Sequence, residues 1–369
     1  PLVRTGDPAY FVNIAQYLKD NKPLNKYYYK LNFPNEYEDI IDPPLISVII
    51  SYLSKDASLE EIVKASNKLI LFSSVMTCFG IFFLFYAIGR PYEGIIASLG
   101  GGISTDYFFR SSIGYIDTDI LNLFFIYLLF GLIYMSSKNQ SLTKGIFFII
   151  LAGVIGRIFY LWYPKPELIL MSFFSLVFFT SLNTKSLKII SSHSVIFILL
   201  TGPNIYLNSF SIFFNNPYLK EYLSANINIA DLVNTTKLNF NSIFSYIAEQ
   251  QKPSLLRILS IEGSFYLGFI CFFGILLWAI TYPILFIGLA PLSLFFLLSF
   301  ILGYRALFYS GPFFWFGAIY LINFISFKFI SQKKIQINKE YIYLITTVFL
   351  MIFLSISTKS FTRDIVKTY

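Results

Sequence analysis

Residues 117–138 have the sequence DTDILNLFFIYLLFGLIYMSSK, in which two carboxylates, Asp117 and Asp119, directly precede a long apolar stretch. An apolar stretch of about 20 residues is what a helix needs to cross the hydrocarbon core of a bilayer. Ionisable groups at a membrane boundary are costly and usually functional. These residues therefore predict a membrane-spanning helix with a polar site at one end.

The composition of the whole chain agrees with this interpretation. The chain has 369 residues, of which 56% are hydrophobic and 13% are charged, whereas soluble domains average about 25% charged residues. Two Cys exclude a disulfide scaffold, and a single His argues against His-rich metal sites and a Ser–His triad. The net charge of +8 comes without a basic tail, so we expect no nucleic-acid partner. The predicted fold class is an all-α, polytopic integral membrane protein.

Hydropathy predicts about ten membrane-spanning helices. They are Leu69–Ile88, Gly94–Ser104, Ile120–Met135, Gly145–Trp162, Leu168–Leu182, Ile189–Leu200, Phe265–Ala279, Ile284–Leu302, Phe313–Phe327 and Tyr341–Ile356. We expect one membrane domain over residues 1–369, made of an outer N-terminal segment (1–66), a first helix group (67–202), an outer loop (203–262) and four last helices (263–369).

Lysine and arginine in the short connections predict the orientation, because such residues accumulate on the cytoplasmic side. Alternate connections carry Arg90, Lys138, Lys144, Lys185, Lys188, Lys328, Lys333, Lys334 and Lys339. The opposite, outer side then receives both large non-membrane segments. It also receives the acids and arginines that look out of place in a membrane protein, namely Asp7, Asp117, Asp119, Glu249, Arg110, Arg257 and Arg305.

Each of these residues also has a structural explanation. An Asp before a helix is a common N-cap that complements the helix dipole, and an ion pair from Arg110 to one of the acids could merely close the loop. Gly6-Asp7-Pro8 is an ordinary turn signal. Glu249 could be a solvated loop residue, and Arg305 could anchor at the headgroups.

Taken together, the outer residues favour one chemistry. Several carboxylates brought together by folding would repel one another unless a divalent cation lay between them. Oxygen ligands favour Mg²⁺ or Mn²⁺ over zinc, and an arginine beside them is a fixed donor for phosphate oxygens. A metal ion with an arginine at a membrane surface suits cleavage of a lipid-linked phosphate or pyrophosphate.

The motifs resemble those of the catalytic subunit of oligosaccharyltransferases, closest to the bacterial single-subunit (PglB) type. Arg110 followed by Gly114-Tyr115-Ile116-Asp117-Thr118-Asp119 is similar to the second acidic motif of the family, with the same spacing. Gly6-Asp7 resembles its first acidic motif, and Tyr246-Ile247-Ala248-Glu249 resembles the motif of its outer loop. Two further runs, Leu161–Pro164 and Arg305–Pro312, have counterparts in the same order.

The resemblance implies a GT-C type membrane domain and a metal-dependent, inverting glycosyltransferase. It would transfer an oligosaccharide from a lipid pyrophosphate to an acceptor Asn in a protein sequon. The implied cation, Mn²⁺ or Mg²⁺, would be bound by Asp7, Asp117 and Glu249, with Asp119 as a further candidate ligand. Asp7, Glu249, Arg110 and Asp119 are the implied catalytic residues. Arg305 would bind the donor pyrophosphate, and Arg257 would bind the acceptor.

The chain also departs from the family pattern. None of Trp162, Trp278 and Trp315 lies in the Trp-Trp-Asp motif that reads the sequon in the family's periplasmic domain. We therefore expect a fragment of a longer product, without that domain and the first helix. The implied location is a bacterial inner membrane with the site on the periplasmic face, and we expect a monomer. Two alternatives remain: a membrane glycosyltransferase that uses a polyprenyl-phosphate donor on another acceptor, and a transporter with buried acids.

Overall fold

The computed structural model of the chain describes residues 6–22, 43–139, 142–184, 186–207, 265–302, 304–332 and 340–348, together with Ser209, Ser254, Ile258 and Leu259. Within these ranges the regular structure is entirely helical. The predicted all-α class is therefore confirmed for the part of the chain that the structure describes.

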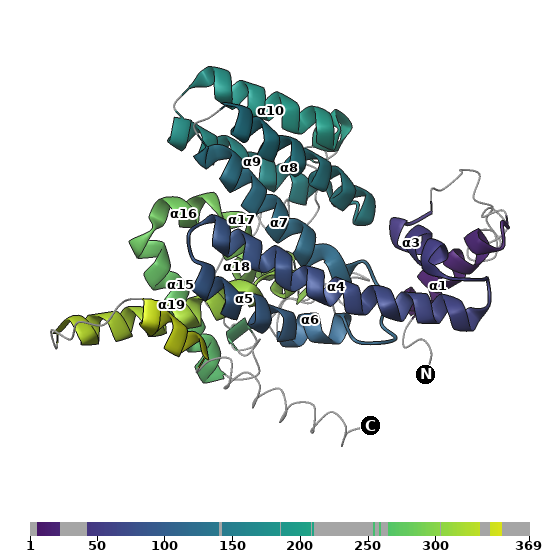
Figure 1. Ribbon diagram of the computed structural model, residues 1–369, viewed down its shortest axis with the longest axis horizontal. Helices are drawn as coiled ribbons and strands as arrows, with labels where there is room; N and C mark the ends of the chain where they lie inside the picture. The colour runs from purple at the N-terminus through teal and green to yellow at the C-terminus, as the bar shows by residue number, and fades with distance from the viewer. Residues whose placement is uncertain are drawn as a thin grey trace, which may run out of the picture.

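Three helices form the N-terminal part. α1 (Gly6–Lys19) and α3 (Leu45–Leu53) pack together beside the start of the long helix α4 (Leu59–Ala87), as Figure 1 shows at the N-terminal end of α4. The Ser47 hydroxyl donates to the Phe11 carbonyl of α1 at 3.0 Å, and the Lys19 ammonium donates to the Ser54 carbonyl at 2.7 Å. These bonds fix α1, the helix that carries Asp7, against α3 and the residue that follows it.

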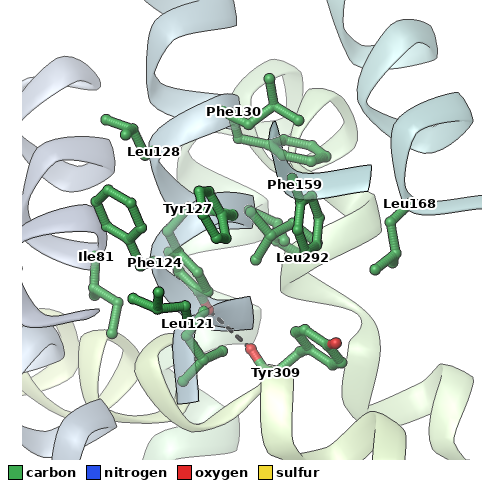
Figure 2. Close-up of a cluster of buried hydrophobic side chains, with 14 of the residues drawn as sticks. Ile81, Leu121, Phe124, Tyr127, Leu128, Phe130, Phe159, Leu168, Leu292 and Tyr309 are labelled. Atoms are coloured by element: carbon green, nitrogen blue, oxygen red, sulfur yellow. Dashed lines mark hydrogen bonds between the residues drawn. The ribbon is translucent and has the colours of Figure 1, made fainter. Parts of the chain in front are cut away.

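The helix predicted from residues 117–138 is the centre of the fold. In α7 (Asp119–Lys138), 89% of an 18-residue apolar stretch is buried inside the protein. The corresponding share is 39–50% in the four other long apolar helices described. α7 packs against α4 and against α8 (Leu142–Trp162) and α9 (Pro166–Thr184), with α10 (Leu187–Thr201) beyond them. Figure 2 shows the aromatic and aliphatic side chains that surround it. A site at the start of α7 therefore rests on the most deeply buried of the long apolar helices described.

One expected span in the second half of the fold is broken, which hydropathy did not predict. The expected span Ile284–Leu302 is broken into α16 (Pro283–Gly288), α17 (Ala290–Ser293) and α18 (Phe295–Leu302). Pro291 lies at the start of α17. Its ring supplies no amide hydrogen and clashes with the preceding turn, which accounts for the break between α16 and α17. Hydropathy averages do not detect such a break.

Most of the other expected spans correspond to single helices. Among the described residues, five helices are long and apolar enough to cross a membrane, namely α4, α7, α8, α9 and α19 (Gly311–Gln332). Two shorter apolar helices, α10 and α15 (Phe265–Thr281), and the 13-residue α5 (Pro91–Ile103) occupy further expected spans. Residues 340–348 form the start of the last one. The total of about ten stays a prediction, because some of that span lies outside the described residues.

Helices α15 and α19 cross at a pair of glycines. A Cβ added to Gly274 of α15 would lie 1.8 Å from the carbonyl oxygen of Gly317 of α19. Small residues at such crossings let two membrane helices approach closely. The crossing matters for the site, because α19 follows directly after the 3₁₀ helix η4 (Tyr304–Tyr309), which carries Arg305.

We expect Gly274→Ala to destabilise the fold by about 3 kcal/mol or more, since the added methyl group meets backbone and overpacking of this kind has no low-energy rearrangement. The measurement is the unfolding midpoint in detergent, followed by tryptophan fluorescence. Gly102→Ala is the matched control, because its Cβ would meet only the Cys78 sulfur at 3.2 Å. Equal midpoints for the two variants would contradict the assigned close crossing.

Candidate active site at the start of α7

A short loop of residues 111–118, called here the acidic loop, joins α6 (Thr105–Arg110) to α7. It carries Asp117, and Asp119 is the first residue of α7. The loop turns at Gly114, whose φ of 85° is a left-handed conformation that residues with a side chain rarely adopt. The Gly114 amide donates to the Asn67 Oδ1 of α4 at 3.2 Å. α4 therefore fixes the turn that leads the chain back to Asp117.

Asp119 is held by two donors at once. Its carboxylate is 1% exposed, accepts the Arg110 guanidinium on Oδ2 at 2.5 Å, and accepts the Asn122 amide on Oδ1 at 2.9 Å. Arg110 is itself only 15% exposed. Charge-assisted bonds of this kind are strong and directional. The ion pair that the structural explanation of Arg110 allowed is therefore present, and each oxygen of Asp119 already has a protein donor.

Asp117, two residues before Asp119, is also buried, with 6% of its surface exposed. Its Oδ1 accepts the Thr118 amide at 2.6 Å and the Thr118 hydroxyl at 3.2 Å. The N-cap position of α7 belongs to Thr118, which makes no side-chain capping bond, and Asp119 is the first helical residue. Neither acid is therefore the N-cap that the simplest structural explanation required, although Asp119 still complements the helix dipole.

Trp162 at the end of α8 anchors the peptide between the two acids. Its indole N–H donates to the Thr118 carbonyl at 2.6 Å, and its ring lies 6.1 Å from that of Phe125 on α7. The side chain is 2% exposed. Because Thr118 separates the two carboxylates, this bond fixes the direction in which both leave the backbone.

Tyr107 of α6 ties the loop to α4 and α7. Its hydroxyl lies 2.9 Å from that of Thr77 and 3.0 Å from the Ile120 carbonyl. Burial raises the pKa of the Tyr107 phenol well above its ordinary value, so the group remains a neutral donor. Its ring also contacts Phe308 of η4, with 5.5 Å between centroids.

The helix that carries Arg305 is thereby placed against α6 and α7, the two helices that flank the acidic loop. η4 contacts α6 through the Tyr107–Phe308 ring pair, and the Tyr127 hydroxyl of α7 donates to the Tyr309 carbonyl at 2.9 Å (Figure 2). The fold thus brings together the segment with Asp117 and Asp119 and the backbone that bears Arg305, which are far apart in sequence. The side chain of Arg305 is not among those described.

The remaining predicted site residues are only partly placed. Asp7 is the second residue of α1, with its backbone described and its side chain not, while Glu249 and Arg257 lie outside the described residues. Among the described side chains no three of His, Cys, Asp and Glu cluster as metal ligands do. The predicted ligand set requires Asp7 and Glu249, so its completeness stays a prediction.

Sequence reasoning missed the residues that support the site. Asn122 is fully buried, and its Oδ1 has no hydrogen-bond partner among the described atoms. Its position was visible as the one amide in an apolar run, three residues after Asp119, where helical neighbours face each other. Asn67 and Tyr107 carry no such local signal, because their contacts join segments distant in sequence.

We expect Trp162→Phe to cost about 1–3 kcal/mol, because the Thr118 carbonyl would lose its buried donor. Trp278→Phe is the matched control. Trp278 is also fully buried, but its indole nitrogen has no hydrogen-bond partner among the described residues. Both variants lose the same volume, so the difference between their unfolding free energies isolates the hydrogen bond. A larger loss for Trp278→Phe would contradict the role of Trp162 as an anchor.

Comparison with known proteins gives a fold relationship. No protein-family model matches the chain, and neither does any curated protein sequence. The structure is similar to the oligosaccharyltransferase of Archaeoglobus fulgidus in the apo form, with a TM-score of 0.60 at 12% identity. It is also similar to the archaeal oligosaccharyltransferase AglB from Archaeoglobus fulgidus in complex with an inhibitory peptide and a dolichol-phosphate, with a TM-score of 0.58 at 12% identity.

Each of these matches covers 94% of this chain and 50% of the solved chain, so the chain spans about half the length of the structures it resembles. At this level of identity the likeness is one of fold. The chain has the fold of an oligosaccharyltransferase membrane domain, as its motifs predicted, and its apolar helices are those of an integral membrane protein.

Proposed function

We propose that this chain belongs to a metal-dependent, inverting glycosyltransferase that transfers an oligosaccharide from a lipid pyrophosphate to the side-chain amide of Asn in a protein acceptor. The observation that carries the proposal is the Arg110–Asp119 pair with Asp117 beside it, buried at the start of the central helix of an oligosaccharyltransferase fold. A buried acidic pair with a fixed arginine is a costly arrangement for a loop that only connects two helices.

The donor chemistry of the site fits a hard divalent cation. Asp117 offers a carboxylate whose direction is fixed by Thr118 and, through the Trp162 anchor, by α8. We assign Asp117, with Asp7 and Glu249, as the ligands of Mn²⁺ or Mg²⁺, which prefer oxygen ligands. When bound, the cation would neutralise charge on the pyrophosphate leaving group.

Asp119 has a different role in this proposal, although its carboxylate was also a candidate ligand. Both of its oxygens accept protein donors, from Arg110 and Asn122. This arrangement favours a group that positions Arg110 and shapes the pocket beside the ligands. Arg110 then presents a fixed positive charge at the edge of the site, where phosphate oxygens of the donor would lie.

The remaining roles follow the resemblance of the motifs. Arg305, on the helix η4 that packs against α6 and α7, would bind the donor pyrophosphate. Asp7 and Glu249 would accept hydrogen bonds from the acceptor amide and twist its nitrogen out of conjugation, which frees a lone pair that amide resonance otherwise holds. Arg257 would contact the acceptor chain.

One further observation supports a lipid donor and a peptide acceptor, and another supports the location of the site. The solved AglB structure contains an inhibitory peptide and a dolichol-phosphate, so that protein of the same fold binds both classes of ligand. The lysine-rich connections also predict that α7 begins on the outer side of the membrane. We therefore propose a site on the periplasmic face of a bacterial inner membrane.

The test is a transfer assay with the full-length gene product in lipid nanodiscs, a lipid-linked oligosaccharide, a fluorescent sequon peptide and Mn²⁺. We expect a glycopeptide whose anomeric configuration is inverted, and we expect chelation by EDTA to abolish it until Mn²⁺ is restored. A peptide with Gln in place of the acceptor Asn is the control. Failure to form glycopeptide with a protein that binds both substrates would overturn the proposal.

A further inference from the structure

The proposed function does not use the outward-facing surface of helices α15 and α19. Helices α15 and α19 border an apolar groove of about 460 Å³ on the outside of the bundle. Its walls are formed by the side chains of Phe273, Leu277, Leu321, Phe324, Ile325 and Phe329. Several of these are well exposed, with Ile325 at 57% and Phe329 at 54%. The lining of this groove has the apolar chemistry of a site for an acyl chain.

The polar end of the groove is formed by Lys328 and Gln332 in the last turns of α19. Lys328 is exposed, and within the described part of the chain no carboxylate lies within ion-pair distance of its ammonium group. Lys328 therefore gives this end of the groove a positive charge.

Arg90 is a useful contrast on the same side of the membrane. Its guanidinium pairs with the buried Glu93 at 3.5 Å and lies over the rings of Tyr282 and Tyr320, at 4.7 and 5.6 Å from their centroids. The Arg90 cation is therefore already paired within the protein. Lys328, which borders an apolar groove instead, is placed to meet a charge that comes from outside.

We propose that the groove binds an anionic phospholipid, with one acyl chain between α15 and α19 and the phosphate beside Lys328. The lysine-rich connections place this end of α19 on the side predicted to be cytoplasmic, where anionic lipids attract basic residues close to the membrane. A zwitterionic lipid would gain the same apolar contact but less from the ammonium group. The charge of Lys328 therefore favours an anionic headgroup, and the apolar groove accommodates one acyl chain.

This site is distinct from the proposed donor site. Lys328 lies 17 residues after Gly311 on α19, which corresponds to about 25 Å along a helix. η4 and the acidic loop are at the other end. A lipid phosphate beside Lys328 therefore cannot be the one that Arg305 is proposed to bind, and the inference holds whether or not the proposed function does.

The test uses Phe324→Trp as a reporter inside the groove, in nanodiscs that contain phosphatidylcholine with either brominated phosphatidylglycerol or brominated phosphatidylcholine as a minor component. Bromine quenches tryptophan only at close range. We expect about fivefold tighter binding of the phosphatidylglycerol, the selectivity that one lysine at a membrane surface provides. Adding Lys328→Glu should remove that preference, and Lys188→Glu, on an exposed residue of α10, should leave it intact.

Equal quenching by the two lipids, or a preference that survives Lys328→Glu, would overturn the proposal. If the reporter variant does not fold, native mass spectrometry of the unmodified full-length protein and of the Lys328→Glu variant gives the same comparison. There the expected result is retained phosphatidylglycerol on the unmodified protein and its loss from the variant. Transfer activity is not part of the readout, so failure here leaves the proposed function untouched.

Discussion

Replacing Asp117 with Asn is expected to reduce glycopeptide formation by at least about 100-fold, the scale of losing one preorganised electrostatic group from an active site. The amide keeps the size of the carboxylate and can still accept the Thr118 amide on its oxygen. What it loses is the negative charge that we assign to cation binding. The affinity for Mn²⁺, measured by electron paramagnetic resonance, should fall together with the transfer rate.

The matched control is Asp56→Asn. Asp56 is an acid in the turn before α4, on the same predicted side of the membrane, and its carboxylate caps the Ser58 amide at 2.8 Å. Its replacement should leave both Mn²⁺ affinity and transfer unchanged. Full activity of the Asp117→Asn variant would show that this carboxylate is not a ligand, while normal Mn²⁺ affinity with lost transfer would assign it a role in chemistry alone.

Much of the fold was accessible from the sequence, because crossing a membrane imposes a simple pattern. The apolar run after Asp119 predicted α7, and burial in the structure makes that helix the centre of the bundle. What hydropathy could not show was the break at Pro291, since averaging over a window hides a single residue without an amide hydrogen. Packing order among the helices was likewise invisible, because apolar residues face lipid and protein alike.

Part of the candidate site could also be predicted from the sequence, because a membrane protein carries few charged residues. Charged residues are scarce in this chain, so Arg110, Asp117 and Asp119 stood out. The structure pairs Arg110 with Asp119 and buries Asp117 two residues away. The residues that orient them did not stand out. Trp162 reaches Thr118 from a different helix, and a tryptophan in an apolar run resembles ordinary packing. Contacts between distant segments are set by the tertiary fold, which local pattern does not encode.

Arg110→Met is the second change with a large expected effect, and here the effect is on stability. It would leave the Asp119 carboxylate, which is 1% exposed, without its cation. Removing one partner of a buried ion pair costs about 3–5 kcal/mol, which we expect as a lower unfolding free energy in detergent. Lys64→Met is the control, because Lys64 pairs with Glu61 at the surface, with 55% of its side chain exposed. That change should cost less than about 1 kcal/mol.

The double variant Arg110→Met/Asp119→Asn separates a structural ion pair from a functional one. Asparagine removes the unpaired charge and can still accept the Asn122 amide, so most of the lost stability should return. If the pair only closes the loop, the stable double variant will also transfer glycan. If the pair holds Arg110 towards the donor phosphates, the double variant will fold, bind Mn²⁺ through Asp117 and fail to form glycopeptide. We expect the second result, because a loop that needed only closing would not require a charge so deeply buried.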